Sequence, residues 1–291
     1  MTMSDGLVTP DGRKIERFVV GYSGGKDSLA TAILCRDLGP TMLLHADTGW
    51  EHPGHADYLH ASAKALDLPL VIVRSDRGGM ADLVKHKRMF PSRTRRFCTT
   101  ELKIKPIAAY LRAQDDEVVS VVGVRAEESA ARAKLEEWSP FEEGDCWTWR
   151  PLLNWPMGQV IDIIRAAGLD LHPHYHDGAT RVGCYPCIYA RKAEIAALPD
   201  WRVAEIEALE REVQGVAKDG GTRAFFNCKD PTNASGTGFV PIRRVVEWAR
   251  TSRGGRELLL PLPVEAPCVA WGLCERPAEV AQQVNNAEVV K

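Results

Sequence analysis

The chain has 291 residues, of which 45% are hydrophobic and 26% charged, and this balance excludes a wholly disordered protein. Its 37 Lys and Arg residues and 39 Asp and Glu residues leave a net charge of −2, so overall charge alone cannot hold a polyanion. No apolar run is long enough to cross a membrane, and the first residues lack the apolar core of a signal peptide. We therefore expect a cytoplasmic protein without a membrane partner, whose eight cysteines are thiols, metal ligands or redox groups rather than disulfides.

Short apolar runs alternate with helical patterns in the first half of the chain. Strands are expected at Arg17–Tyr22, Thr41–Ala46, Pro69–Val73 and Val118–Val124. Helices are expected at Asp27–Leu38, Ala56–Leu66 and Pro106–Leu111. This alternation predicts an α/β fold with a doubly wound, mostly parallel sheet.

The pattern changes after the fourth predicted strand. Arg125–Arg150 is a long polar segment that we expect to be functional or partly helical. Helices are predicted at Met157–Ala167, at 188–213 and at Val240–Arg250. The polar ends, residues 1–14 and 278–291, are predicted to be flexible tails.

The segment Ser23–Ser28 (Ser-Gly-Gly-Lys-Asp-Ser) lies between the first predicted strand and the first predicted helix. Gly24 and Gly25 allow a tight turn and a close approach to a ligand. The start of the helix offers backbone N–H groups and a positive dipole end, while Lys26 adds a charge and the two serines add hydroxyl donors. The segment differs from a Walker A loop and from the dinucleotide-binding motif. It predicts a phosphate-binding loop of another class, and an ordinary glycine turn is the alternative.

With this loop the chain resembles the PP-loop, or N-type ATP pyrophosphatase, superfamily, whose signature is S-G-G-x-D-S after the first strand. Further segments resemble the phosphoadenosine phosphosulfate (PAPS) reductase branch of that superfamily. They are His45–Pro53 (D-T-G-x-E-x-P), Phe97–Pro106 (C-T-x-x-L-K-x-x-P), Gly123–Arg132 (G-x-R-x-x-E-S-x-x-R) and Pro151–Trp155. The resemblance covers about residues 17–190 and implies an adenine nucleotide α-hydrolase-like fold.

The resemblance also implies a reaction. In this superfamily a substrate oxygen attacks the α-phosphate of ATP, which releases pyrophosphate and leaves an adenylated intermediate. The reductases carry a degenerate loop because they use a ready-made sulfonucleotide, whereas this chain keeps the complete Ser23–Ser28 sequence. The complete loop favours an enzyme that activates its substrate with ATP, as in the DNA phosphorothioation sulfurtransferases and tRNA thiolases that share the fold.

Several charged residues are assigned to the nucleotide site. Asp47 follows the second predicted strand, where its carboxylate could hold the Mg²⁺ of bound ATP or simply cap a turn. Thr48 is assigned to the same site. Arg125 and Arg132 carry guanidinium groups that suit phosphate, with a local salt-bridge network as the alternative. The candidate catalytic residues are Lys26, Asp27, Asp47 and Arg125.

A basic block separates the third and fourth predicted strands. Between Arg74 and Arg112 there are eleven Lys or Arg residues and three Asp or Glu residues, a local charge of +8. This block could bind a polyphosphate, a sulfonucleotide or a nucleic-acid backbone, or it could be a solvated basic helix.

The cysteines indicate a metal centre. Four of the five residues Cys98, Cys184, Cys187, Cys268 and Cys274 are expected to bind one metal, because thiolate-rich sites select Zn²⁺ or iron–sulfur clusters. A redox pair at the C-x-x-C and unliganded thiols are the alternatives. The segment Gly183–Cys187 resembles the G-C-x-P-C of adenylyl-sulfate reductases, which implies a 4Fe-4S cluster. Phe97 replaces the first cysteine of that family's Cys-Cys pair, which makes Cys268 or Cys274 the expected substitute.

Two aromatic sets complete the candidates. His172, His174 and His176 alternate along the chain, and we expect hydrogen-bonded loop histidines there rather than a metal site. Trp147, Trp149 and Trp155 could stack on a base, but core packing is the more common outcome.

Together these features predict a PP-loop nucleotide-binding domain at 15–180 and a Cys-rich, mainly helical segment at 181–277. The predicted enzyme is an ATP-dependent adenylating sulfurtransferase that uses ATP with Mg²⁺ and a 4Fe-4S cluster, or Zn²⁺ in its place. Its expected partners are a sulfur donor such as a cysteine desulfurase and DNA or tRNA as acceptor, and a homo-oligomer is left open. One rival is a PAPS or adenylyl-sulfate reductase in which Cys274 attacks the sulfur, and another is a non-catalytic, zinc-stabilised nucleic-acid-binding module.

Overall fold

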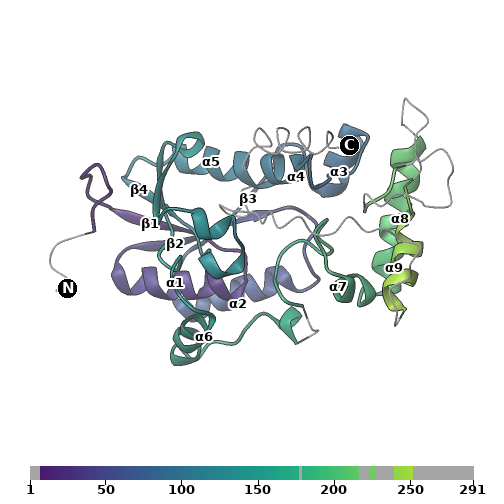
Figure 1. The fold of residues 1–291 in the computed structure, drawn as a ribbon. Helices are drawn as coiled ribbons and strands as arrows, with labels where there is room; N and C mark the ends of the chain where they lie inside the picture. Colours follow the sequence, from purple (N-terminus) through teal and green to yellow (C-terminus); the bar gives the residue numbers. More distant parts are fainter. Residues whose placement is uncertain (1–6, 177–178, 216–222, 227–238, 252–291) are drawn as a thin grey trace, which may run out of the picture.

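A six-stranded sheet forms the centre of the molecule (Figure 1). The computed structural model describes residues 7–176, 179–215, 223–226 and 239–251. The strands are β1 (Arg17–Gly21), β2 (Thr41–Asp47), β3 (Leu70–Arg74), β4 (Val118–Val121), β5 (Trp138–Phe141) and β6 (Cys146–Trp149). Their order is β3-β2-β1-β4-β6-β5, and all neighbours are parallel except β5 and β6. The predicted doubly wound, mostly parallel sheet is confirmed.

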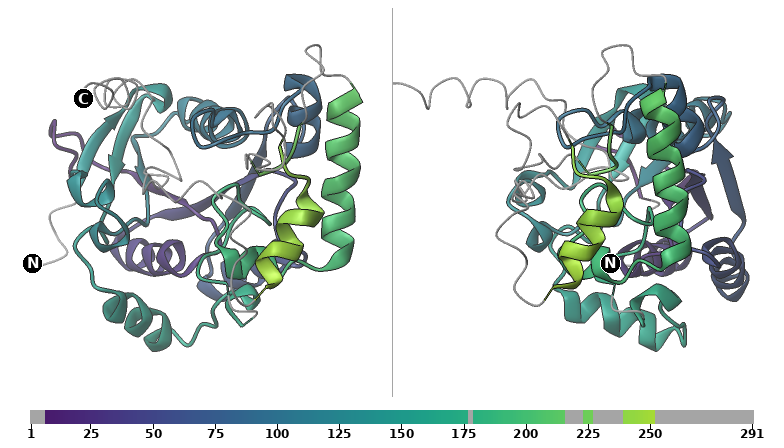
Figure 2. Two further views of the ribbon diagram at one scale, coloured as in Figure 1. Left: turned by 45° about the vertical axis from the view of Figure 1, so that its right-hand side comes forward. Right: turned by 90° about the vertical axis from the view of Figure 1, so that its right-hand side faces the viewer.

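Helices cover both faces of this sheet (Figures 1 and 2). On one face α1 (Lys26–Leu38), α2 (His55–Leu66) and α6 (Met157–Ala166) bury apolar side chains against the strands. On the other face α4 (Phe97–Thr99) continues through a π-helical turn at Thr100–Ile104 into α5 (Lys105–Arg112), which packs on β1 and β2. Strands buried on both faces explain the continuous apolar runs in the sequence.

The strand order places a reversal point between β1 and β4. The chain moves from β1 outward to β2 and β3, then returns to β4 on the opposite side of β1. In open α/β sheets, ligands bind at the carboxyl ends of the strands that flank such a point. The segment Ser23–Ser28 follows β1, and Gly123 follows β4, so both lie at this edge.

The structure corrects the prediction for Arg125–Arg150. This segment contains β5 and β6 together with short 3₁₀ turns at Ala126–Glu128, Arg132–Lys134 and Glu142–Gly144. The rings of Trp138 and Trp149 stack with their centroids 5.5 Å apart, and Trp149 is buried. In the sequence, these four-residue strands look like parts of a loop. Their side chains become buried only when the two strands pair, so neither strand has a strong pattern of its own.

Three further differences concern a helix, a strand end and the start of the chain. Helix α3 (Met80–Lys87) is absent from the prediction, and β4 ends at Val121 instead of Val124. Residues 7–14, expected to be part of a loose tail, form a turn in which Val8 bridges to Lys14.

A second apolar cluster lies beyond the sheet. The helices α7 (Lys192–Ala196), α8 (Asp200–Gly215) and α9 (Ile242–Arg250), here called the C-terminal helices, pack on α3 and on Trp50. Figure 2 shows α8 and α9 side by side at one end of the molecule. Their helical character agrees with the prediction, while Cys268 and Cys274 lie outside the described residues. In the part of the chain that the structure describes, no helix has the length and apolarity needed to pass through a bilayer.

Candidate functional site

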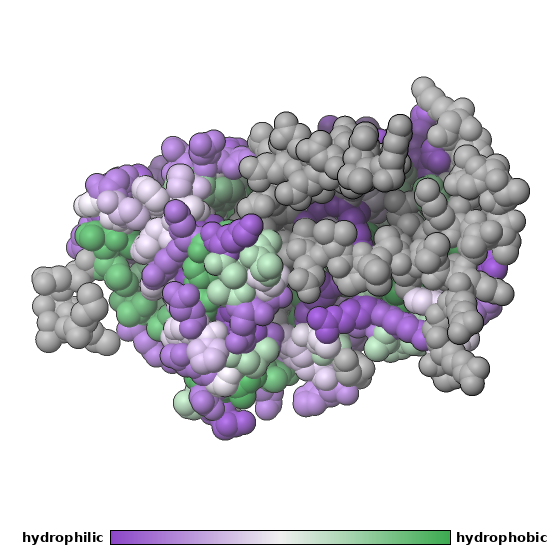
Figure 3. Space-filling view, viewed as in Figure 1, coloured by the Kyte–Doolittle hydropathy of each residue, from purple (hydrophilic) through white to green (hydrophobic). Residues whose placement is uncertain are grey.

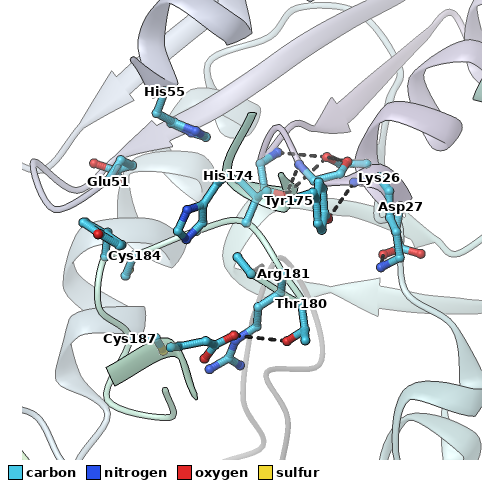
Figure 4. A pocket seen from close by; sticks show the side chains of 18 of the residues that line it. Lys26, Asp27, Glu51, His55, His174, Tyr175, Thr180, Arg181, Cys184 and Cys187 are labelled. Atoms are coloured by element: carbon cyan, nitrogen blue, oxygen red, sulfur yellow. Dashed lines mark hydrogen bonds and ion pairs between the residues drawn. The ribbon is translucent and has the colours of Figure 1, made fainter. Parts of the chain in front are cut away.

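A cleft of about 590 Å³ opens at the carboxyl edge of the sheet. One wall is the phosphate loop, Ser23–Ser28, and the opposite wall is the segment 179–187, here called the cysteine wall (Figure 4). The floor includes His45 and Ala46 at the end of β2. This volume lies within the range of small-molecule and cofactor sites.

The phosphate loop is shaped by its own hydroxyl groups. Gly24 has a φ of 71°, a left-handed conformation that favours glycine. The Ser28 hydroxyl donates to the Gly25 carbonyl at 2.9 Å and accepts from the Ser23 N–H at 3.2 Å. The predicted turn before α1 is therefore present, with the start of the helix directed at the cleft.

Lys26 and Asp27 form one end of a chain of charges. The Lys26 ammonium lies 2.7 Å from Asp27 Oδ2, and Arg125 Nε lies 2.6 Å from Asp27 Oδ1. Arg125 is only 2% exposed and also pairs with Glu127. Asp27 therefore connects the loop lysine to a buried arginine from the segment after β4.

Close packing at Gly123 fixes this connection. A Cβ atom at Gly123 would lie 2.6 Å from both the Asp27 carbonyl oxygen and the Thr31 hydroxyl. Only glycine permits the strand β4 end to approach α1 this closely.

Tyr175 covers the loop from the opposite side. Its hydroxyl oxygen accepts a hydrogen bond from the Lys26 backbone N–H at 3.1 Å. Burial raises the pKa of Tyr175 to about 12, so the phenol is protonated near neutral pH. No role for Tyr175 was predicted from the sequence.

The aspartate predicted to hold Mg²⁺ lies away from the loop. Asp47 Oδ2 is 2.7 Å from Arg74 Nε, and Asp47 Oδ1 accepts from the Gly49 N–H at 2.7 Å. Burial alone would raise the pKa of Asp47, but the Gly49 N–H and Arg74 outweigh it, and the pKa lies below its usual value. Both carboxylate oxygens are thus engaged, and Asp47 does not line the cleft.

Other predicted residues divide between the cleft and its surroundings. Thr48 is buried and donates its hydroxyl and its N–H to Glu51, which lines the cleft. Arg132 lines the cleft and pairs with Glu128, whereas Arg125 lies behind Asp27. The structure therefore brings Arg125 to the loop as a support and Arg132 to the rim.

Distant residues hold the cysteine wall in place. Trp50 accepts a hydrogen bond at its carbonyl from the Tyr185 N–H and donates its indole N–H to the Pro186 carbonyl at 3.1 Å. The Arg202 guanidinium of α8 lies 3.8 Å from the Trp50 ring centroid, and its Nε donates to the Tyr185 carbonyl at 2.7 Å. The C-x-x-C is thus fastened between the D-T-G turn and the C-terminal helices.

The thiols occupy two positions. Cys184 and Cys187 line the cleft, and burial raises the pKa of Cys184. Cys98 in α4 packs against the same apolar cluster as Cys184. Among the residues that the structure describes, no three His, Cys, Asp or Glu side chains are grouped so that they could hold one metal ion. The three described candidates, Cys98, Cys184 and Cys187, are therefore not grouped as a metal site, and Cys268 and Cys274 lie outside the described residues.

Histidines line the floor between the two walls. His45 Nδ1 lies 2.8 Å from the Tyr22 carbonyl, and His55 Nδ1 lies 3.1 Å from His172 Nε2. Burial lowers the pKa of His45 and, with the nearby His45 and His172, lowers that of His55 to about 3. The hydrogen-bonded loop histidine expected at position 172 is present.

Sequence reasoning missed several residues of the cleft. They are His45, Glu51, His55, Lys103, Tyr175, Thr180 and Arg181. Glu51 and Lys103 lie within the motifs D-T-G-x-E-x-P and C-T-x-x-L-K, so the motif positions could have indicated them. The others come from elements that only the fold brings together.

Three residues of the predicted basic block form ion pairs with acidic side chains. Arg74 binds Asp47, Lys85 binds Glu212, and Lys105 binds Glu101. From this block only Lys103 and Ile107 are in the described lining of the cleft. The face drawn in Figure 3 mixes hydrophilic and hydrophobic patches in the described part of the chain.

The chain is similar in sequence to several known proteins. The model of the phosphoadenosine phosphosulfate reductase domain matches residues 17–190. An uncharacterized 37.8 kDa protein of Escherichia phage 186 is 31% identical, with 88% of this chain and 96% of that protein covered. An uncharacterized protein of Methanocaldococcus jannaschii is also 31% identical, with 72% of this chain and 51% of that protein covered.

Two similarities involve named enzymes. Adenosine 5'-phosphosulfate reductase of Burkholderia cepacia is 30% identical over 96 residues, which cover 33% of this chain and 37% of the reductase. The crystal structure of PAPS reductase from Candida auris aligns with a TM-score of 0.48 and 17% identity, covering 58% of this chain and 82% of that chain. Because the family model spans more than half of the 291 residues, the chain belongs to the phosphoadenosine phosphosulfate reductase domain family.

Proposed function

We propose that this protein is an enzyme that binds ATP in the cleft, adenylates a substrate with release of pyrophosphate, and supports transfer of sulfur to that substrate. The observation that carries the proposal is the complete phosphate loop at the reversal point of the sheet, facing Cys184 and Cys187 across one cleft. Membership of the PAPS reductase domain family supports a nucleotide-dependent reaction that involves sulfur.

The loop suits stabilisation of a leaving pyrophosphate. In the proposed step a substrate oxygen bonds to the α-phosphorus, the bond from that phosphorus to the α,β-bridging oxygen breaks, and pyrophosphate leaves with the electron pair. The Lys26 ammonium and the N–H groups at the start of α1 would oppose the charge that develops on the phosphates. The Lys26 N–H, which donates to the Tyr175 hydroxyl in the structure, would donate to a phosphate oxygen once the nucleotide is bound.

Mg²⁺ would supply further neutralisation of the triphosphate. Asp47, the predicted ligand, has both oxygens engaged by Arg74 and Gly49, so its present geometry does not fit that role. No metal ion at Asp47 therefore takes part in the proposed reaction.

The cysteine wall is the proposed site of sulfur chemistry. The proposed ligands of a 4Fe-4S cluster, or of Zn²⁺ in its place, are Cys184, Cys187, Cys98 and either Cys268 or Cys274. The three described thiols are not grouped for a metal in this structure, so they would have to come together to hold one. When bound, an iron–sulfur cluster would supply iron that can coordinate sulfur. The terminal sulfur of a persulfide donor such as a cysteine desulfurase would attack the adenylated substrate, displace AMP and form a disulfide between donor and substrate. A thiol reductant would then cleave this disulfide and leave the sulfur on the substrate, with DNA or tRNA as the candidate acceptor.

One observation favours a second function. The similarity to adenosine 5'-phosphosulfate reductases supports reduction of a sulfonucleotide, in which a cysteine thiolate such as that of Cys274 attacks the sulfur and releases the nucleotide. In that reaction the α,β-phosphoanhydride of ATP is never cleaved.

Exchange of labelled pyrophosphate into ATP, measured with a pool of tRNA and DNA under anaerobic conditions, tests the adenylation. We expect exchange by the wild type, loss of at least tenfold in Lys26→Ala, and no change in Lys14→Ala, an exposed control. Release of sulfite from adenosine 5'-phosphosulfate with a thiol reductant, together with no exchange, would establish the reductase instead.

A further inference from the structure

His55 is the first residue of α2 and lines the floor of the cleft. A Cβ atom placed on Gly24 would come within 3.0 Å of His55 Cε1, so the imidazole lies directly beneath the phosphate loop. Figure 4 shows the ring of His55 extending from α2 toward the middle of the cleft. The proposed reaction assigns no role to this side chain.

Hydrogen bonds determine which nitrogen of His55 carries the proton. The backbone N–H of His174 donates to His172 Nδ1 at 3.0 Å, so His172 Nδ1 has a lone pair and its proton is on Nε2. His172 Nε2–H in turn donates to His55 Nδ1 at 3.1 Å. His55 Nδ1 is therefore the acceptor, and the neutral ring of His55 carries its proton on Nε2.

Among the described residues, no acceptor faces this proton. His55 is 3% exposed, and its Nε2 is buried without a hydrogen-bond partner among the described residues. A buried donor without a partner costs free energy, and an isolated one in a native structure calls for an explanation. Burial and the neighbouring histidines hold the pKa of His55 near 3, so the ring stays neutral and acts as a donor at Nε2 rather than as a cation.

We propose that His55 is a nucleotide-binding residue whose Nε2–H donates to an acceptor atom of the adenine nucleotide bound at the phosphate loop. The inference rests on the proposed function for the identity of the ligand. His172 acts as a positioning residue, since its Nε2–H fixes the tautomer of His55. A small shift of the buried ring or of Gly24 on binding would give the ligand access to Nε2.

The tautomer can be tested without any nucleotide. In the protein labelled with ¹⁵N-histidine, two-bond ¹H–¹⁵N correlations at pH 7.5 distinguish a protonated from an unprotonated ring nitrogen. We expect His55 with Nε2 protonated and Nδ1 unprotonated, and a mixture of tautomers after His172→Leu. A His55 ring protonated at Nδ1 in the wild type would overturn the proposal.

Ligand binding is tested with two isosteres. Gln places its amide nitrogen near the position of His Nε2, whereas Asn can accept from His172 but has no group at that position. We expect His55→Asn to weaken ATP binding about tenfold and His55→Gln to keep it within about twofold, as measured by titration calorimetry. His60→Asn, an exposed position on the same helix, is the matched control and should bind like the wild type.

The failure of this inference differs from the failure of the proposed function. If the wild type binds ATP and His55→Asn, folded by circular dichroism, binds it equally well, only the role of His55 is contradicted. Wild type that binds no ATP contradicts the proposed function and the nucleotide-binding role together, while the expected tautomer would still support the relay from His174 to His55.

Discussion

The two walls of the cleft are built in different ways. The phosphate loop forms within six consecutive residues, where the hydroxyl of Ser28 bonds to Gly25 and to the N–H of Ser23. The cysteine wall forms between parts of the chain that are far apart, because it is bonded to Trp50, 136 residues before Pro186, and to Arg202 on helix α8. One wall is a local structure, and the other depends on tertiary contacts.

This difference has an energetic consequence. The loop connects directly to the buried sheet through Asp27, Arg125 and Gly123, so changes there should affect the stability of the whole domain. The cysteine wall is attached through a few contacts to the C-terminal helices, so changes there should open it locally. The following variants test this contrast, beginning with the largest expected effect.

Asp27→Ala should destabilise the protein by about 4 kcal/mol, because it leaves the buried guanidinium of Arg125 without one of its two carboxylate partners. Urea unfolding of the two proteins measures the difference. Asp37→Ala, which removes an exposed pair with Arg36 on the same helix, should cost less than about 0.5 kcal/mol. Equal losses in the two variants would contradict the role of Asp27 as the connection to the sheet.

Glu210 gives a pH-dependent test of the C-terminal helices. Its buried carboxylate accepts the N–H groups of Phe225 and Ile242, and burial raises its pKa to about 7 from an ordinary value of 4.5. The folded-state pKa of Glu210 lies above the unfolded one. The contribution of protonated Glu210 to the free energy of unfolding is therefore fully present below pH 4.5 and is lost as the pH rises through 7. Relative to Glu210→Gln, the wild type should lose up to about 3 kcal/mol across this window. Parallel pH profiles of unfolding free energy would refute the prediction.

Gly123→Ala should cost about 2 kcal/mol, because the added methyl would meet the Asp27 carbonyl and the Thr31 hydroxyl at 2.6 Å. Thermal or urea unfolding provides the measurement. Gly158→Ala in α6, where nothing lies within 4 Å of the new atom, should be neutral or slightly stabilising. A Gly123 variant as stable as its control would show that β4 and α1 can separate freely.

Arg202→Ala should have the smallest global effect and a clear local one. Loss of the stacking on Trp50 and of the bond to Tyr185 should raise the alkylation rate of Cys184 and Cys187 about fivefold. Mass spectrometry of the labelled peptides reports each thiol separately. Arg165→Ala, which changes an exposed residue of α6, should leave the alkylation rates unchanged. Unchanged rates in the Arg202 variant would show that α8 does not hold the cysteine wall in place.

The phosphate loop could be predicted from the sequence. The Ser23–Ser28 segment, the strand before it and the helix after it were predicted within one or two residues, because hydrophobic periodicity and glycine positions are local signals. The same holds for the doubly wound sheet, whose strands are continuous apolar runs. The strands β5 and β6 were missed because each is short and acquires its burial from the other.

The histidines of the cleft could not be predicted from the sequence. His55 and His172 are 117 residues apart, and nothing near either residue indicates that they share a hydrogen bond. Asp47 illustrates the converse limit. It was predicted to follow the second strand and is the last residue of β2, so its place at the sheet edge was predicted within one residue. Its partner was not predicted, because Arg74 on the neighbouring strand β3 engages the carboxylate. Which partner a charged group finds depends on the register of the sheet.

Equilibrium binding of ATP, measured by titration calorimetry, tests the central claim most directly. The account predicts saturable binding to the wild type at one site, at least tenfold weaker binding to Lys26→Ala, and wild-type affinity in Lys14→Ala. Absence of ATP binding to the folded wild type, or equal affinity in the Lys26 variant, would contradict the claim that the loop after β1 holds the phosphates of a nucleotide.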